Sequence, residues 1–204
     1  MRTTTRTCLL LLAASAALAG CGDPYRDRLI ENLPAEDPAF GPGELHRPGQ
    51  PCVACHSSYG GAPEFAIGGT LFAATKVDEV PAMLSGYTIR VHDSEGSARD
   101  AVSNACGNFF IRSDDWNPAF PLLVEILAGD PAGPSALVPV SSMGSRIARE
   151  GSCGGCHVGR PSPISPGIVA IPGTSNASPN ASVVGTCPTP WLGPDPHAPV
   201  QGAK

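Results

Sequence analysis

Residues 85–96 read SGYTIRVHDSEG, and their side chains alternate in polarity. Apolar residues lie on one face and polar residues on the other: Tyr87, Ile89 and Val91 against Thr88, Arg90 and His92. A period of two is typical of a β-strand with one buried face. The DSEG sequence that follows favours a turn. This stretch therefore predicts a strand that ends in a tight turn.

Four neighbouring runs also have the composition of short strands. They are IGGTLFAAT (67–75), FFI (109–111), PLLVEILAG (121–129) and ALVPVSS (136–142). Glycine, asparagine and aspartate residues separate them, as is usual between strands of an antiparallel sheet. The expected fold class is mainly β, with a small antiparallel β-sandwich at residues 66–142.

The pattern GGTLF … GYTIRVHDSEGSARDAVSNACGNFFI resembles the carboxypeptidase regulatory-like or transthyretin-like sandwich. The resemblance covers roughly residues 66–142, and a general immunoglobulin-like sandwich is the alternative. Such domains serve mostly as scaffolds or binding modules, so the resemblance implies no catalysis of its own.

Proline-rich segments flank the expected sandwich. Residues 21–50 are predicted to form a coil tether with one short helical turn at YRDRLIENL, residues 25–33. Residues 161–204 contain ten prolines. This tail is predicted to run as coil across the surface without adding a core element.

Residues 1–20 have the features of an export signal. Two arginines precede the apolar run CLLLLAASAALA, which is too short to span a bilayer as a stable helix. The run ends in LAGC at residues 18–21, which resembles the lipobox of bacterial lipoproteins. The resemblance implies cleavage before Cys21 and lipidation of Cys21, with the mature protein anchored to the cell envelope. Gly22 follows instead of aspartate, which implies the outer membrane, on its periplasmic or its exposed side. The alternatives are an ordinary signal peptide with a chance cysteine, or a buried helix.

The charge of the chain argues against nucleic acid as a partner. The formal net charge is −5, and it becomes −7 without Arg2 and Arg6 of the leader. No run of basic residues remains to bind phosphates. An acidic surface instead suits protein partners that carry a basic docking patch.

A Cys-x-x-Cys-His motif occurs twice, as CVACH at 52–56 and CGGCH at 153–157. The motif resembles the attachment signature of c-type haem. The resemblance implies two covalent haems and an iron ligand beneath each: Cys52 and Cys55 with proximal His56, and Cys153 and Cys156 with proximal His157. The two attachment segments are expected at residues 51–65 and 143–160, on either side of the sandwich.

Three other interpretations of the motifs stay open. Four cysteines bind zinc in ribbons whose pairs are about 15–20 residues apart, whereas 97 residues separate Cys55 from Cys153 here. A thioredoxin-like dithiol is expected at a helix start in a βαβ unit, and no such unit is evident. Finally, each pair could be a local disulfide.

The second iron ligands are less well defined by the sequence. His46 lies six residues before Cys52 and could fold over a haem, and His92 projects from the polar face of a strand. Met143 lies ten residues before Cys153, although the ligand methionine follows the motif in small monohaem cytochromes. His46, His92 and Met143 are the candidates for the distal positions. His197 lies in the proline-rich tail and is not favoured.

The cysteine count suggests one disulfide. Of eight cysteines, Cys8 leaves with the leader, Cys21 takes lipid and four belong to the two motifs. Free thiols are uncommon in exported proteins, so Cys106 and Cys187 are expected to pair. The alternative is that Cys106 is a small buried strand residue.

Two functions follow from these features. The first is a dihaem c-type cytochrome lipoprotein that transfers electrons between redox proteins of the envelope, and is therefore not an enzyme. The second is a surface-anchored binding or structural module whose Cys-x-x-Cys-His pairs are disulfides or a metal site. A dihaem peroxidase ranks last, because the chain is short for that family and shows no further motif.

Overall fold

The structure is a computed structural model that describes residues 23–61, 63–76, 79–133, 136–163, 165–183 and 185–193. The chain divides into two compact units, one up to Leu33 and one from Pro34 onward. The predicted leader, the lipidation site Cys21 and the tail residue His197 lie outside the described residues.

The described part of the first unit is helix α2, Pro24–Glu31, which confirms the helical turn expected there. Proline occupies the first helical position, where its missing N–H costs no hydrogen bond. The Oδ1 atom of Asp23 accepts hydrogen bonds from the N–H groups of Tyr25 and Arg26, each at 3.1 Å. These bonds satisfy two of the free N–H groups at the start of the helix. In the described ranges, no helix combines the length and the apolarity needed to cross a membrane.

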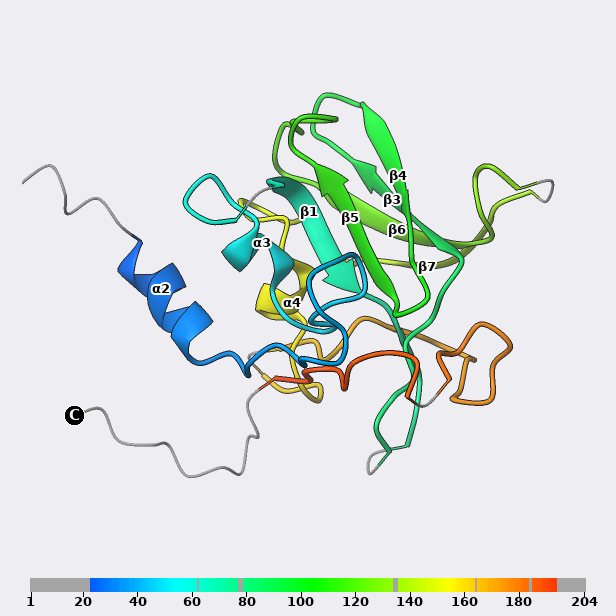
Figure 1. The fold of residues 1–204 in the computed structure, drawn as a ribbon. Coiled ribbons are helices and arrows are strands. Elements are labelled where there is room, and N and C mark those ends of the chain that lie inside the picture. Colours follow the sequence, from blue (N-terminus) through cyan, green and yellow to red (C-terminus); the bar gives the residue numbers. More distant parts are fainter. Residues whose placement is uncertain are drawn as a thin grey trace, which may run out of the picture. The chain divides into compact units, whose positions relative to one another are not determined.

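The second unit is mainly β, as the sequence predicts. Its elements in chain order are α3 (Cys52–Cys55), β1 (Phe65–Thr70), β2 (Phe72–Ala73), β3 (Tyr87–His92), β4 (Ala98–Val102), β5 (Asn108–Arg112), β6 (Leu123–Ala128), β7 (Val138–Ser142), α4 (Cys153–Cys156) and β8 (Ala170–Ile171). Strands β4, β3, β6 and β7 form an antiparallel sheet in that order, β1 pairs antiparallel with β5, and β2 pairs parallel with β8. Figure 1 shows the β1–β5 pair beside the four-stranded sheet.

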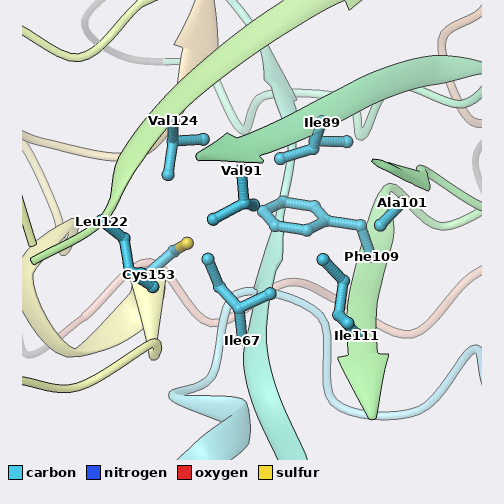
Figure 2. Close-up of a cluster of buried hydrophobic side chains, with 9 residues drawn as sticks. All are labelled: Ile67, Ile89, Val91, Ala101, Phe109, Ile111, Leu122, Val124 and Cys153. Carbon is cyan, nitrogen blue, oxygen red and sulfur yellow. The ribbon is translucent and has the colours of Figure 1, made fainter. Parts of the chain in front are cut away.

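The main core lies between the β1–β5 pair and the four-stranded sheet (Figure 2). Its buried members come from five strands, the residue before β6 and the second motif: Ile67, Ile89, Val91, Ala101, Phe109, Ile111, Leu122, Val124 and Cys153. The predicted alternation holds at Ile89 and Val91, which enter the core, but it fails at the start of β3, where Thr88 is fully buried and Tyr87 is only half-buried. The polar Arg90 and His92 are only partly buried.

Strand β4 was not among the predicted strands. Its sequence, ARDAV, contains one β-branched residue and two charges, so propensity alone gives little indication of a strand. Two contacts explain its place beside β3. Arg90 donates to both carboxylate oxygens of Asp100 directly across the two strands, at 2.8 and 2.7 Å, and Ala101 is buried in the core.

The proline-rich flanks are mostly coil, but parts of them pack into the unit. Asn108 of β5 donates from its side-chain amide to the carbonyl oxygens of Glu44 and His46, and Gln50 is 7% exposed. The prediction that residues 161–204 add no core element is wrong at β8. Ile171 is 2% exposed there and packs against a second apolar cluster. The apolar run from Ile168 to Ile171 forms this strand although prolines lie on both sides of it.

Cys106 and Cys187 form a disulfide, the pairing that the cysteine count predicts. Both residues are buried in a small cluster with Phe72 and Met83. The bond joins the turn before β5 to the C-terminal coil, 81 residues away.

Removing this disulfide should weaken the fold. A Cys106→Ala/Cys187→Ala variant is expected to lose about 2–4 kcal/mol in its free energy of unfolding, because a long loop is no longer closed in the unfolded chain. Urea unfolding of the variant and of the wild type, with and without reductant, would measure this. Equal midpoints for oxidised wild type and variant would contradict the prediction.

Candidate functional site

The two Cys-x-x-Cys-His motifs adopt the same local structure. Each forms a four-residue helix, α3 or α4, and each histidine is the residue that ends it. The N–H of His56 donates to Cys52 O at 2.9 Å, and the N–H of His157 donates to Cys153 O at 2.8 Å. A helical turn places residues i, i+3 and i+4 on one side. The cysteines and the histidine of each motif therefore belong to one turn, although their exposure differs: Cys153 is buried and Cys156 is exposed.

Strand β1 supports both helices (Figure 1). A Cβ atom added at Gly68 would lie 2.9 Å from Cys52 Cβ, and one added at Gly69 would lie 2.7 Å from Cys153 Cβ. Real Cβ atoms do not approach other atoms so closely, so both positions require glycine. Successive residues of a strand face opposite sides. Cys52 thus lies over one face of β1, and Cys153 lies over the face that meets the core.

The two motif segments also touch each other. A Cβ at Gly154 would lie 2.9 Å from the carbonyl oxygens of Gly49 and Gln50, which lead into α3. Before α4, the carbonyl of Gly151 accepts a hydrogen bond from Gly68 N–H at 2.9 Å. Residues about 100 positions apart in the sequence are therefore held against one another by main-chain contacts.

Each motif histidine contacts a main-chain carbonyl through Nδ1. The Nδ1 atom of His56 lies 2.8 Å from Pro63 O, and Nδ1 of His157 lies 2.8 Å from Gly167 O. A carbonyl oxygen only accepts hydrogen bonds, so Nδ1 must carry the proton in both rings. The lone pair of the neutral imidazole is then on Nε2. Histidines that bind metals are oriented in this way by a hydrogen bond from the other nitrogen.

The four motif cysteines are free thiols. Burial raises the pKa of the Cys52 thiol and that of the Cys153 thiol to about 12. These two thiols stay protonated at neutral pH, which makes them poor nucleophiles toward other disulfides. By exposure, Cys52 and Cys55 are both half-buried, whereas Cys153 is buried and Cys156 is exposed. The two cysteines of the second motif therefore differ clearly in accessibility.

A cavity of about 320 Å³ adjoins the second motif. Cys153, His157 and Met143 line it together with apolar side chains from β3, β5 and β6. Figure 2 shows Cys153 among the apolar side chains of the core. The volume is at the lower end of the range of cofactor sites, which are largely apolar with a few polar groups.

The first motif lies against aromatic side chains. The His56 ring stacks on Phe65 with centroids 4.2 Å apart, and Phe65 stacks on Phe110 at 4.6 Å. The His46 ring lies on the same group, 5.7 Å from that of His56. Sequence reasoning did not identify these phenylalanines. In the β1–β5 pairing Phe65 lies opposite Arg112 and Phe110 lies opposite Gly68, and the register shifts between Phe65 and Ile67.

The residues at both motifs fit a covalently attached porphyrin. Each provides two free thiols on one helical turn, an imidazole with Nε2 available and apolar surroundings. Two buried hydroxyls, Ser57 and Ser152, find no hydrogen-bond partner in the part of the chain that the structure describes. Each adjoins a motif, and a buried hydroxyl without a protein partner has room for a water, an ion or another bound group beside it.

The three candidates for the distal position differ in where they lie relative to the two motifs. His46 lies beside His56, and Met143 lines the cavity of His157. His92 lies near neither motif histidine, because its Nε2 is 3.0 Å from Glu125 Oε2 on the face of β3 opposite Ile89 and Val91. Within the described ranges, no three residues among histidine, cysteine, aspartate and glutamate gather as a metal site.

Comparison with known proteins assigns no family, because no family model, curated protein or solved structure matches this chain.

The contact between the motif segments can be tested within the second motif itself. Gly154→Ala should lower the free energy of unfolding by about 1–3 kcal/mol, because its methyl group would press on two carbonyl oxygens. Gly155→Ala is the matched control, because its Cβ would meet atoms only at 3.8 Å or more. It should leave stability unchanged or raise it by up to about 1 kcal/mol through helix propensity. Urea unfolding of the two variants would measure the difference, and equal losses would contradict the contact.

Proposed function

We propose that this protein is a dihaem c-type cytochrome lipoprotein that transfers electrons at the cell envelope. The observation that carries the proposal is the repeated site: two identical helical turns, each with free thiols and with a histidine whose Nδ1 donates to a main-chain carbonyl. A local disulfide gives no reason for this orientation of both imidazoles, and among the described residues no three histidine, cysteine, aspartate or glutamate side chains gather as a zinc site would require.

The chain's own residues would hold and orient the groups. Cys52 and Cys55 at one site, and Cys153 and Cys156 at the other, would form the thioether bonds. His56 and His157 would bind the two irons through Nε2, with Pro63 O and Gly167 O fixing the rings. A haem bound in this way carries one electron through its iron. The phenylalanines at the first site and the apolar cavity at the second would keep water away.

Further features support an exported, membrane-anchored carrier. The Cys106–Cys187 disulfide is typical of proteins that fold in an oxidising compartment. The leader and Cys21 would supply the lipid anchor, with the outer membrane as the expected site. The net negative charge suits transient contact with redox proteins that have basic surfaces. We propose no substrate and no catalytic residue.

Haem loading is the first test. After expression with a c-type maturation system, intact mass and a pyridine haemochrome spectrum should show two covalent haems per chain. The Cys52→Ala/Cys55→Ala and Cys153→Ala/Cys156→Ala variants should each retain one. A haem-free chain with two additional disulfides would contradict the proposal and favour the surface-anchored module.

The lipid anchor has its own test. Wild-type protein expressed in a bacterium that processes lipoproteins should fractionate with membranes, because several acyl chains bind a bilayer far more strongly than one. A Cys21→Ser variant should be released from membranes or retain its leader, as its intact mass would show. If the wild type and the Cys21→Ser variant associate equally with membranes and carry the same added mass of lipid, lipidation at Cys21 is contradicted.

A further inference from the structure

We propose that the two sites have different ligand sets, with His46 as the second axial ligand at the first and Met143 at the second, so that the second site has the higher reduction potential. This inference rests on the proposed function.

His46 is held in place by the same strands that support the first motif. Its carbonyl accepts a hydrogen bond from Asn108 Nδ2 at 3.0 Å, and Asn108 Oδ1 accepts one from Thr70 Oγ1 at 2.7 Å. Thr70 Oγ1 in turn accepts from Gly49 N–H at 2.7 Å. The segment from His46 to Gly49 is therefore bonded to β1 and β5, and is not a loose loop.

The His46 ring is directed to the first site. It lies 5.7 Å from the His56 ring, and its Nδ1 contacts the carbonyl oxygen of Gly43 in its own turn. Nδ1 also lies 3.4 Å from Gly43 N, so both contacts of Nδ1 stay within this turn and Nε2 is the ring nitrogen left for a metal. The next residue, Arg47, has φ +48, a conformation that costs about 1–2 kcal/mol for a residue with a Cβ. Bonds from Arg47 Nη1 to Pro34 O and Gln50 Oε1 help to hold this turn.

Met143 lines the cavity at the second site. Its N–H donates to Val124 O at 3.0 Å, which fixes it just beyond β7. Its side chain packs on the main core and lines the cavity with His157 and Cys153. The other polar side chains that line this cavity are serine hydroxyls, which are harder ligands than a thioether. Among the residues that line the cavity, Met143 is thus the best suited to be the second ligand of the iron.

His92 does not compete for either position. Its Nε2 is 3.0 Å from Glu125 Oε2, on a partly exposed face of β3. It therefore serves as the matched control in the test below.

The ligand difference gives the two sites different roles. Methionine with histidine raises the reduction potential of a c-type haem relative to other ligand sets. The second site would therefore accept an electron first, and an electron entering at the first site would move to the second. The chain would then have a built-in direction of transfer.

The test is a spectroscopic redox titration of the full-length, doubly loaded protein, with haem content confirmed by mass. Two one-electron steps should appear whose reduction equilibria differ at least tenfold, which corresponds to about 59 mV. The oxidised protein should show the weak far-red absorption of a thioether–iron bond. Both Met143→Leu and Met143→His should abolish that absorption and shift only the higher step downward. Leucine matches methionine in size, and histidine supplies another ligand.

His46→Phe should shift the lower step and change its low-spin electron paramagnetic resonance signal, whereas His92→Phe should change neither step. A fully loaded protein in which Met143→His leaves the far-red absorption and both potentials unchanged would overturn the assignment of Met143. The absence of any effect of His46→Phe would overturn that of His46. In both cases the dihaem proposal would survive. A protein without haem would overturn the proposed function and this inference together.

Discussion

The close contact of two cysteine side chains with the Gly68–Gly69 pair of β1 is the constraint on which the candidate sites depend. Each added Cβ would lie less than 3.0 Å from the Cβ of Cys52 or Cys153. Glycine in the interior of a strand weakens it, and it often marks a place where another segment approaches closely. In β1 the two glycines lower strand stability, but they allow both α3 and α4 to pack against a strand of six residues. The β1–β5 pairing and the Thr70–Asn108 hydrogen bond keep the strand in place without those side chains.

This arrangement assigns the two motifs to different environments. Cys153 enters the core between the sheets, whereas Cys52 lies over the other face of β1 with the His56–Phe65–Phe110 group. The chain contains only six phenylalanines. Three of them adjoin a motif, since Phe109 lines the cavity of the second site. Two of them, Phe65 and Phe110, give His56 an aromatic surface, whereas Phe109 also belongs to the main core.

The sequence allowed much of the fold to be predicted, because β3, β5, β6 and β7 have apolar residues in runs or alternation between turns. It did not predict β4, whose sequence has low strand propensity and which lies beside β3 through a five-residue antiparallel pairing that includes the Arg90–Asp100 pair. The motifs themselves were evident from local spacing. Their partners were not, because Pro63 and Gly167 contribute carbonyl oxygens, which every residue has. The glycine pair was visible in the sequence, but a doublet in a strand does not say which segment will approach it. His92 illustrates the opposite case, since a polar face suggested an available imidazole and the fold pairs it with Glu125.

A shared strand has a consequence for electron transfer in the proposed cytochrome. Sites on separate domains move relative to each other, so the distance between them varies. Here both motif helices, α3 and α4, contact the same short strand, and main-chain contacts join Gly154 to Gly49 and Gln50. The separation of the two sites is therefore set by close-packed backbone, which deforms little. Because this distance is fixed, the chain could make one site differ from the other only through the residues that face each proposed iron. Main-chain hydrogen bonds hold His46 to β5 and Met143 to β6. The difference between the ligands of the two proposed sites would therefore be as rigid as the distance between the sites.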